Sequence, residues 1–171
     1  MTKPDGETTA AAFTHYVQQA RPQLQRTAYL MCGDWQLADD LTQETIITLY
    51  RRWNALDHDI GPTAYARRVL IHHVRRSAKR AWRSREVMTA PPEAIHEPLH
   101  GIEEREVILR ALARLGPRQR TIVVLRYWED LSVEQTAEAV GCTRGTVTSQ
   151  SHRALATLRA LLGPIVNPTD S

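Results

Sequence analysis

Residues 131–162, with the sequence LSVEQTAEAVGCTRGTVTSQSHRALATLRALL, constrain the fold more than any other part of the chain. Ser132, followed three residues later by Gln135, has the pattern of a capping box at the start of a short helix. Gly141 supplies the permissive backbone that a tight turn needs, and Thr143 can cap a second, longer helix. This spacing predicts a helix-turn-helix, for which the alternative is an ordinary hairpin of two helices.

The second helix of this pair has two chemically different faces. Its apolar residues fall on one stripe that should pack inward, namely Val147, Ala154, Leu155, Leu158 and Leu162. The residues outside that stripe are Thr148, Ser149, His152 and Arg153, with Arg144 at the N-terminal rim. Hydroxyl and guanidinium groups are suited to phosphates and base edges. The residues alone therefore predict that this helix binds duplex DNA in the major groove.

The composition favours an all-helical, cytoplasmic protein. Of 171 residues only 8 are Gly and 6% are aromatic, whereas Ala, Leu and Arg are frequent. We find no run of about eighteen apolar residues and no signal-peptide pattern at the N-terminus, so we expect no membrane insertion. The two cysteines, Cys32 and Cys142, are far apart in sequence and fit reduced thiols rather than a metal-binding pair.

The chain divides into two blocks of helical pattern. The first block covers residues 9–20, 22–32, 35–54 and 63–83, and the second covers residues 102–115, 117–128, 132–140 and 144–162. The stretch between them has the composition of a linker and contains Pro91, Pro92, Pro98 and Gly101. We therefore predict an all-α protein with two small domains, residues 9–84 and 102–163, joined by a flexible linker over 85–101 and followed by a tail over 164–171.

Positive charge is concentrated at the end of the first block. Residues 61–90 hold eight basic side chains and one acidic side chain, a net charge of +7, although the whole chain has a net charge of only +3. The basic side chains of the helix predicted over 63–83 are Arg67, Arg68, Arg75, Arg76, Lys79, Arg80 and Arg83. Tyr65, His72 and Trp82 add flat rings that can stack on unpaired bases. The block is either a solvated basic face or a second surface for DNA.

A third feature is the acidic start of the helix in residues 38–53, ADDLTQETIITLYRRW, for which Asp34 is the expected cap. Its expected inward stripe is Leu41, Thr45, Ile46, Leu49 and Trp53. Its polar cluster is Asp39, Asp40, Gln43 and Glu44. Acidic groups suit the first turns of a helix, so a solvated face is one interpretation. The other is a docking patch for a basic partner helix.

Taken in order, these blocks resemble a known family. The acidic ADDLTQE helix, the arginine-rich helix, the Pro-rich linker and the C-terminal GTVTSQSHRALATLR helix are similar to those of the extracytoplasmic-function (group 4) sigma factors of bacterial RNA polymerase. These proteins belong to the sigma-70 superfamily, and the SQSHRALATLR form looks most like an actinobacterial subgroup. The resemblance covers residues 13–162. It implies a sigma-2-like and a sigma-4-like helical domain and a role in directing transcription initiation.

The resemblance also implies partners and roles for particular residues. Asp40, Gln43 and Glu44 fall on the helix that docks on the coiled coil of the largest subunit of core polymerase. The residues that match the reader of the −10 promoter element follow the loop at 57–62, and they are Tyr65, Arg68, His72, Arg75, Arg76 and Lys79. Those that match the reader of the −35 element are Arg144, Thr146, Thr148, Ser149 and Arg153. Further partners implied are the flap of the second-largest subunit, promoter DNA and, in many relatives, an anti-sigma factor.

Two residues depart from the family's usual pattern. Many relatives have Trp where this chain has Thr63, and Asn where it has His72. The packing or stacking contact that this indole makes in those relatives is therefore expected to be absent here. An imidazole can both donate and accept a hydrogen bond, so a different −10 preference is expected.

Two other functional classes compete with the sigma-factor interpretation. A helix-turn-helix regulator without a sigma role would explain residues 131–162, but it would need neither the acidic helix nor the second basic helix. A metal enzyme could use His96 and His100 with Glu93 or Glu97, although these residues lie among prolines without convincing further ligands. We therefore expect no catalytic residue, no cofactor and no metal.

Overall fold

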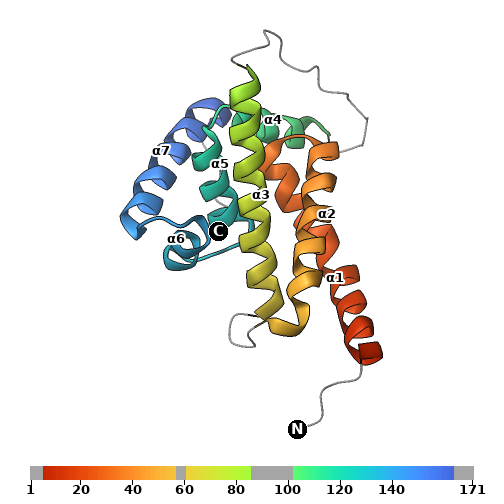
Figure 1. Ribbon diagram of the computed structural model, residues 1–171. Coiled ribbons are helices and arrows are strands. Elements are labelled where there is room, and N and C mark those ends of the chain that lie inside the picture. The colour runs from red at the N-terminus through yellow and green to blue at the C-terminus, as the bar shows by residue number, and fades with distance from the viewer. Residues whose placement is uncertain (1–5, 57–60, 86–101, 164–171) are drawn as a thin grey trace, which may run out of the picture. The chain divides into compact units, whose positions relative to one another are not determined.

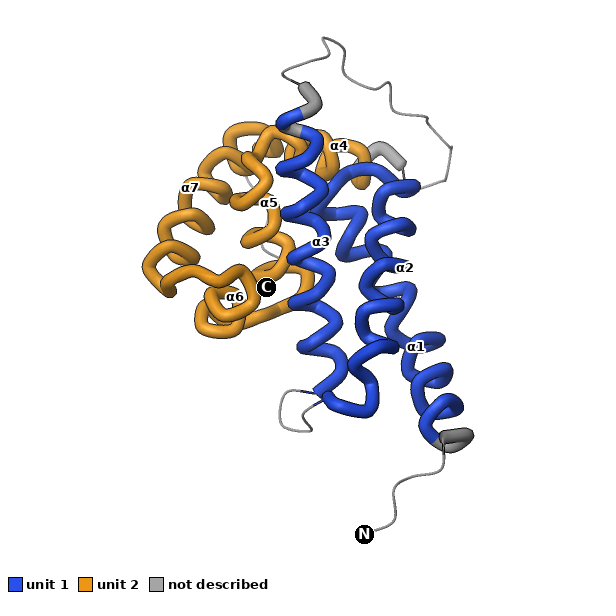
Figure 2. The backbone as a smooth tube through the Cα atoms, viewed as in Figure 1, with its two compact units in different colours: residues 1–84 blue, residues 85–171 orange. Residues whose placement is uncertain are grey.

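The computed structural model describes residues 6–56, 61–85 and 102–163, and every regular element in these ranges is a helix. This confirms the predicted all-α fold class with two helical domains. The chain separates into two compact units, residues 1–84 and 85–171 (Figure 2). The predicted linker over 85–101 and the predicted tail over 164–171 lie almost entirely outside the described residues.

Unit 1 is built from three helices, α1 (Gly6–Cys32), α2 (Trp35–Arg52) and α3 (Gly61–Arg85), with a short 3-10 turn, η1 (Trp53–Ala55), after α2 (Figure 1). α1 and α2 pack against each other, and the side chains of all three helices contribute to one core. The buried apolar residues of this core are Leu24, Ala28, Met31, Ala38, Leu41, Leu49, Ala66, Leu70, Ile71 and Val74.

The expected break between residues 20 and 22 is wrong, because α1 continues through Pro22 as one helix. A proline inside a helix removes one backbone hydrogen bond and usually ends or kinks the helix. Here the residues after Pro22 are held by tertiary packing, since Leu24, Ala28 and Met31 are all buried. The proline ring itself is exposed, so it disturbs only the backbone of one turn.

Unit 2 contains α4 (Ile102–Ala113), α5 (Pro117–Val123), α6 (Val133–Val140) and α7 (Arg144–Leu162). The helix predicted over 117–128 is present, but its last five residues widen into a π-helical turn, η2 (Val124–Trp128). α7 contacts α4, α5 and α6, so it is the central helix of this unit. Val147, Ala154 and Leu158 of its predicted inward stripe are buried, and Leu155 and Leu162 are half-buried.

Candidate nucleic-acid interface

The helix-turn-helix of unit 2 begins and ends at the residues expected from its sequence. At the start of α6 the backbone N–H of Gln135 donates to the Ser132 hydroxyl at 3.1 Å, and the N–H of Ser132 donates to the Gln135 side chain at 2.8 Å. Gly141 ends α6 with a φ of 69°, a left-handed conformation that a side chain would strain. The Thr143 hydroxyl caps α7 by accepting from the N–H of Thr146 at 3.1 Å.

The outer face of α7 exposes the polar side chains predicted to read the −35 element. Thr148, Ser149, His152 and Arg153 are exposed, and Thr146 is half-buried. Two hydroxyls donate to carbonyls of their own helix, Thr148 to Arg144 at 3.1 Å and Ser149 to Thr146 at 3.2 Å. A hydroxyl that donates its hydrogen in this way still has lone pairs that can accept. The face therefore offers acceptors from these hydroxyls and donors from Arg153.

Arg144, the first residue of α7, is held by a residue that the sequence did not single out. Its guanidinium lies 2.7 Å from the carboxylate of Glu134 in α6. The pKa of the Glu134 carboxyl lies below its ordinary value, because its own backbone N–H and the Ser132 hydroxyl donate to it and because Arg144 is close. The ion pair thus joins the two helices of the motif at their N-terminal ends.

The arginine-rich helix α3 carries most of its charged side chains along one side. His72, Arg75, Arg76 and Lys79 are exposed, while Tyr65 and Arg68 are half-buried. Apart from the adjacent Arg75 and Arg76, these residues follow one another at spacings of three and four, which places them along one side of a helix. Arg80 and Arg83 extend the same basic stripe and are exposed. The resemblance assigned the loop at 57–62 to the same surface. The structure describes this loop only from Gly61 onward.

The acidic cluster of α2 separates into two roles. Asp39 is half-buried and accepts from Arg21 at 3.0 Å and Gln25 at 3.2 Å, both in α1, so its charge holds two helices together. It also accepts from Gln43 of its own helix at 2.8 Å. Asp40 is exposed. It accepts from Gln36 of its own helix at 3.4 Å and lies near the Gln43 amide that Asp39 orients.

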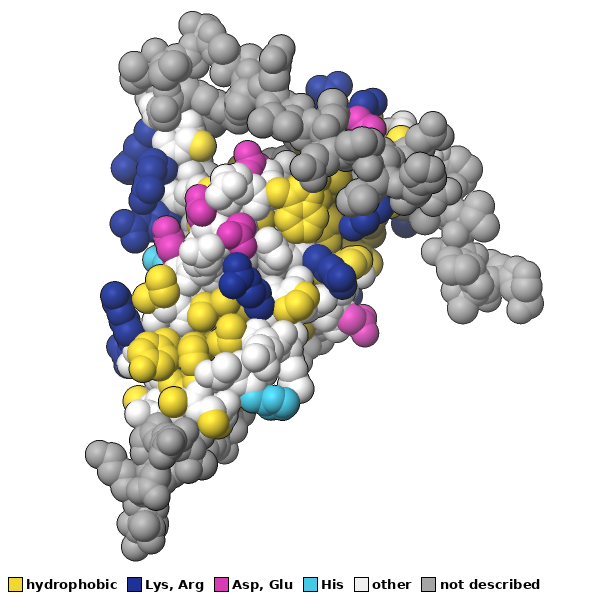
Figure 3. Space-filling view, turned by 90° about the vertical axis from the view of Figure 1, so that its right-hand side faces the viewer, with side chains coloured by type: hydrophobic (Ala, Val, Ile, Leu, Met, Phe, Trp, Pro, Cys, Tyr) yellow, Lys and Arg dark blue, Asp and Glu magenta, His cyan; other side chains and the backbone are white. Residues whose placement is uncertain are grey.

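The face of α2 that carries Asp40, Gln43 and Glu44 continues into apolar residues that the sequence analysis missed. Ile47 and Tyr50 follow at the same helical spacing and are 52% and 62% exposed. The side of unit 1 formed by α1 and α2 shows acidic side chains gathered near hydrophobic ones (Figure 3). An isoleucine at an outward position of an amphipathic helix was the signal that could have identified this extension.

Glu44 connects this face to α3 through His73. The imidazole Nδ1 lies 3.2 Å from the Glu44 carboxylate, and the His73 side chain is only 12% exposed. Burial lowers the pKa of His73, and the nearby His72 and Arg76 lower it further. The negative charge of Glu44 acts in the opposite direction. The proposed docking face on α2 and the basic helix α3 therefore meet at His73. Because burial lowers the pKa of its imidazole, the neutral form of His73 is favoured.

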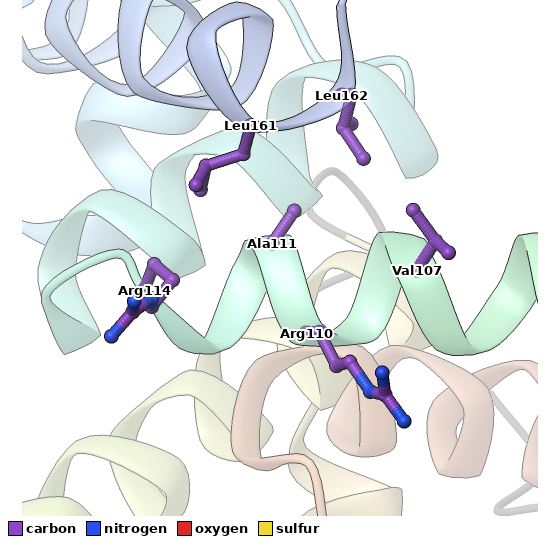
Figure 4. Close-up of a pocket in the computed structure, with 6 residues that line it drawn as sticks. All are labelled: Val107, Arg110, Ala111, Arg114, Leu161 and Leu162. Carbon is purple, nitrogen blue, oxygen red and sulfur yellow. The ribbon is translucent and has the colours of Figure 1, made fainter.

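Unit 2 also has an apolar groove between α4 and the end of α7, with a volume of about 180 Å³. Leu161 and Leu162 of α7 face Val107 and Ala111 of α4, and Arg110 of α4 and Arg114 in the turn after it lie at the edge (Figure 4). Pockets that hold drug-sized molecules are usually larger, roughly 300–1,000 Å³. The groove is better suited to a few apolar side chains of a protein partner.

No three His, Cys, Asp or Glu side chains among residues 6–56, 61–85 and 102–163 are grouped as metal ligands would be. His96, His100, Glu93 and Glu97, the residues of the alternative metal site, lie outside the described part of the chain. In the same described part, no helix has both the length and the apolar character needed to cross a membrane.

Comparison with known proteins gives matches over both units. Residues 16–84 match the family model of sigma-70 region 2, and residues 105–158 match that of sigma-70 region 4. The chain is 38% identical over 152 residues to the RNA polymerase sigma-E factor of Streptomyces coelicolor, and this alignment covers 86% of this chain and 84% of the relative. It is 29% identical over 155 residues to the extracytoplasmic-function sigma factor SigM of Mycobacterium tuberculosis, covering 89% and 78% of the two chains.

Solved structures share the fold at lower identity. The sigma factor RpoE of Bartonella quintana, crystallised with the anti-sigma factor NepR, aligns with a TM-score of 0.74 and 23% identity over 88% of this chain and 96% of that chain. CnrH, solved with the cytosolic domain of CnrY, aligns with a TM-score of 0.66 and 22% identity over 90% and 88%.

Proposed function

Because the chain belongs to the extracytoplasmic-function sigma factors of the sigma-70 family, we propose that its two units divide the work of promoter recognition. A sigma factor binds core RNA polymerase and directs it to the −10 and −35 elements of promoters. We assign core binding and the −10 element to unit 1, and the −35 element to unit 2. The presence of both sigma-70 regions in one chain favours this role over that of a helix-turn-helix regulator.

The observation that carries the assignment of core binding is the exposed face of α2. It presents Asp40, Gln43 and Glu44, followed by the apolar Ile47 and Tyr50. A surface that combines charge with exposed apolar residues is typical of a protein-binding site. We propose that this face docks on the coiled coil of the largest polymerase subunit, with Asp40 supplying an exposed carboxylate.

For the −10 element, the basic stripe of α3 provides the required chemistry. His72, Arg75, Arg76 and Lys79 are exposed along one side, with Tyr65 and Arg68 nearer the start of the helix. Melting a promoter costs stacking and pairing energy, which contacts to phosphates and unpaired bases must offset. We propose that this stripe holds the strand whose bases have separated.

For the −35 element, the outer face of α7 is the proposed reader. In helix-turn-helix proteins the N-terminal residues of the second helix contact base edges in the major groove. Arg144, Thr146, Thr148 and Ser149 occupy that end of α7, and Arg153 lies about two turns further along. We propose that Arg153 supplies a long-reaching donor of this surface.

Unit 2 has a second proposed partner besides DNA. The groove between α4 and α7 offers apolar walls of Val107, Ala111, Leu161 and Leu162. We propose it as the contact for the flap of the second-largest polymerase subunit. In our proposal the chain acts only by binding, without an enzymatic step, and an anti-sigma protein that covered the α2 face would prevent assembly with core polymerase.

The α2 assignment can be tested by co-purification with bacterial core polymerase. The double variant Asp40→Arg with Gln43→Ala should lose association, because a positive charge replaces the exposed carboxylate and the ordered amide is removed. Gln18→Arg, which adds an arginine to an exposed position of α1 in the same unit, is the matched control and should co-purify normally. Wild-type recovery of core by the double variant, with its helicity intact, would refute the assignment.

A further inference from the structure

The N-terminal ends of α6 and α7 carry a charge pair that promoter recognition by itself does not require. Glu134 is the second residue of α6, and Arg144 is the first residue of α7. Their carboxylate and guanidinium lie 2.7 Å apart, although both side chains are more than half exposed. An arginine at a helix N-terminus is disfavoured by the helix dipole, so a carboxylate beside it is a compensating partner.

The carboxylate of Glu134 is held in place by more than this arginine. Its own backbone N–H and the Ser132 hydroxyl donate to it, and the positive charge of Arg126 also acts on it. Arg126 in turn donates a hydrogen bond to the backbone carbonyl of Leu131, which fixes it just before α6. The carboxylate therefore lies at the N-terminus of a helix, a position that also suits a phosphate.

These contacts create a competition when DNA is present. In a helix-turn-helix the first helix crosses the DNA backbone while the start of the second helix enters the groove. Both ends that carry the pair would then lie beside phosphates. Arg144 can pair fully with a phosphate only when Glu134 releases it. Phosphates favour this release, since they repel a nearby carboxylate.

We propose that Glu134 masks Arg144 in the unbound protein and so limits the affinity of unit 2 for the DNA backbone. This inference rests on the proposed contact of Arg144 with DNA. The mask is general rather than sequence-specific, since the phosphate that displaces the carboxylate is the same at every site. Glu134 thereby reduces binding to promoters and to other DNA alike, and it makes strong binding depend on the remaining contacts of α7.

The test is a salt titration of promoter binding by reconstituted holoenzyme, with Glu134→Gln, Arg144→Ala and the double variant. Glu134→Gln should tighten binding about two- to five-fold at low salt, as expected for release of an exposed ion pair. It should also steepen the slope of log K against log salt by up to about 0.9, the value for one phosphate contact. Arg144→Ala should weaken binding and flatten the slope. Glu138→Gln, which removes the same charge one turn later in α6, should leave the slope unchanged.

The double variant distinguishes the mask from simple repulsion. If Glu134 acts mainly through Arg144, Glu134→Gln should have a much smaller effect once Arg144 is alanine, with only the direct repulsion of phosphates by the carboxylate removed. A gain of the same size in the Arg144→Ala background would mean that Glu134 acts on DNA only by direct repulsion, and it would overturn the proposal. Unchanged or weaker binding by Glu134→Gln alone would overturn it as well. If Arg144→Ala binds promoters like the wild type, the proposed DNA contact of Arg144 fails, which is a separate result.

Discussion

At the scale of single residues, the contacts of α2 show how one acidic cluster can serve several purposes. Asp39 accepts from Arg21 and Gln25 of α1 and so supports the fold, whereas Asp40 is exposed and is proposed to bind core polymerase. Glu44 lies against His73 of α3. A substitution at Asp39 should therefore act on stability first, and one at Asp40 should act on partner binding.

The Glu44–His73 contact leads to a prediction about pH. Burial places the pKa of His73 below its ordinary value, and the Glu44 carboxylate opposes that shift. Glu44→Gln should therefore lower the pKa of His73 further, which NMR titration of the imidazole signals can measure. Because the folded state then binds fewer protons than the unfolded state, the free energy of unfolding should decrease as the pH falls below about 6.5, the ordinary value for histidine.

The matched control for this prediction is Asp40→Asn, which removes the same charge from the same helix. The charges that act on His73 are Glu44, His72 and Arg76, so this control should change the titration of His73 much less. A rise in the pKa of His73 in Glu44→Gln, or an equal effect of Asp40→Asn, would contradict the contact seen in the structure.

The residues that sequence analysis predicted correctly are those with local causes. The caps at Asp34, Ser132 and Thr143 each involve a hydrogen bond to a backbone N–H three residues later, so the pattern is readable in a short stretch. The contacts of Asp39 with α1 span 14 and 18 residues of sequence. Such contacts depend on how helices pack, which no single stretch of sequence contains.

At the scale of elements, helical periodicity predicted most helices, and tertiary packing decided the exceptions. Periodicity did not predict that α1 is continuous, because a proline is a strong local signal for a break. The burial of Leu24 and Met31 outweighs this local signal. Periodicity also missed the π-helical turn η2, where the N–H of Glu129 donates to the carbonyl of Val124 at 3.1 Å. Neither exception changes which face of α7 is exposed.

The exposed face of α7 can be tested by comparing two of its arginines. Arg153 and Arg159 are both exposed, but Arg153 lies nearer the N-terminal end that enters the groove in helix-turn-helix proteins. Arg153→Ala should weaken holoenzyme binding to a promoter by about 1–3 kcal/mol if its guanidinium reaches bases or phosphates. Arg159→Ala should cost much less. Equal losses in a gel-shift titration would place the DNA surface elsewhere on α7.

At the scale of the whole molecule, the two proposed DNA surfaces belong to different units and differ in charge. The stripe of α3 lies in the block of residues 61–90, which has a net charge of +7, whereas the chain as a whole has a net charge of only +3. Long-range attraction to phosphates should therefore come mainly from unit 1. Unit 2 should contribute more through the directed hydrogen bonds of α7.

This division predicts how combined substitutions behave. Replacing Arg75, Arg76 and Lys79 by Ala should flatten the salt slope of holoenzyme binding by up to about three phosphate contacts, at roughly 0.7 each for single-stranded DNA. It should also impair promoter opening, measured by permanganate footprinting, because the stripe would no longer hold the separated strand. A matched control, Arg105, Arg118 and Arg159 to Ala, removes the same charge from exposed positions of unit 2 and should open promoters normally.

Adding Arg153→Ala to the α3 triple variant tests the independence of the two units. Substitutions of residues that neither contact one another nor share a contacting group usually contribute additively, within about 0.5 kcal/mol. The loss of binding free energy in the quadruple variant should therefore equal the sum of the two separate losses. A combined loss that is clearly smaller or larger than this sum would mean that the units act on DNA as one coupled body. A triple variant with a wild-type slope and normal opening would instead leave α3 as a solvated basic face.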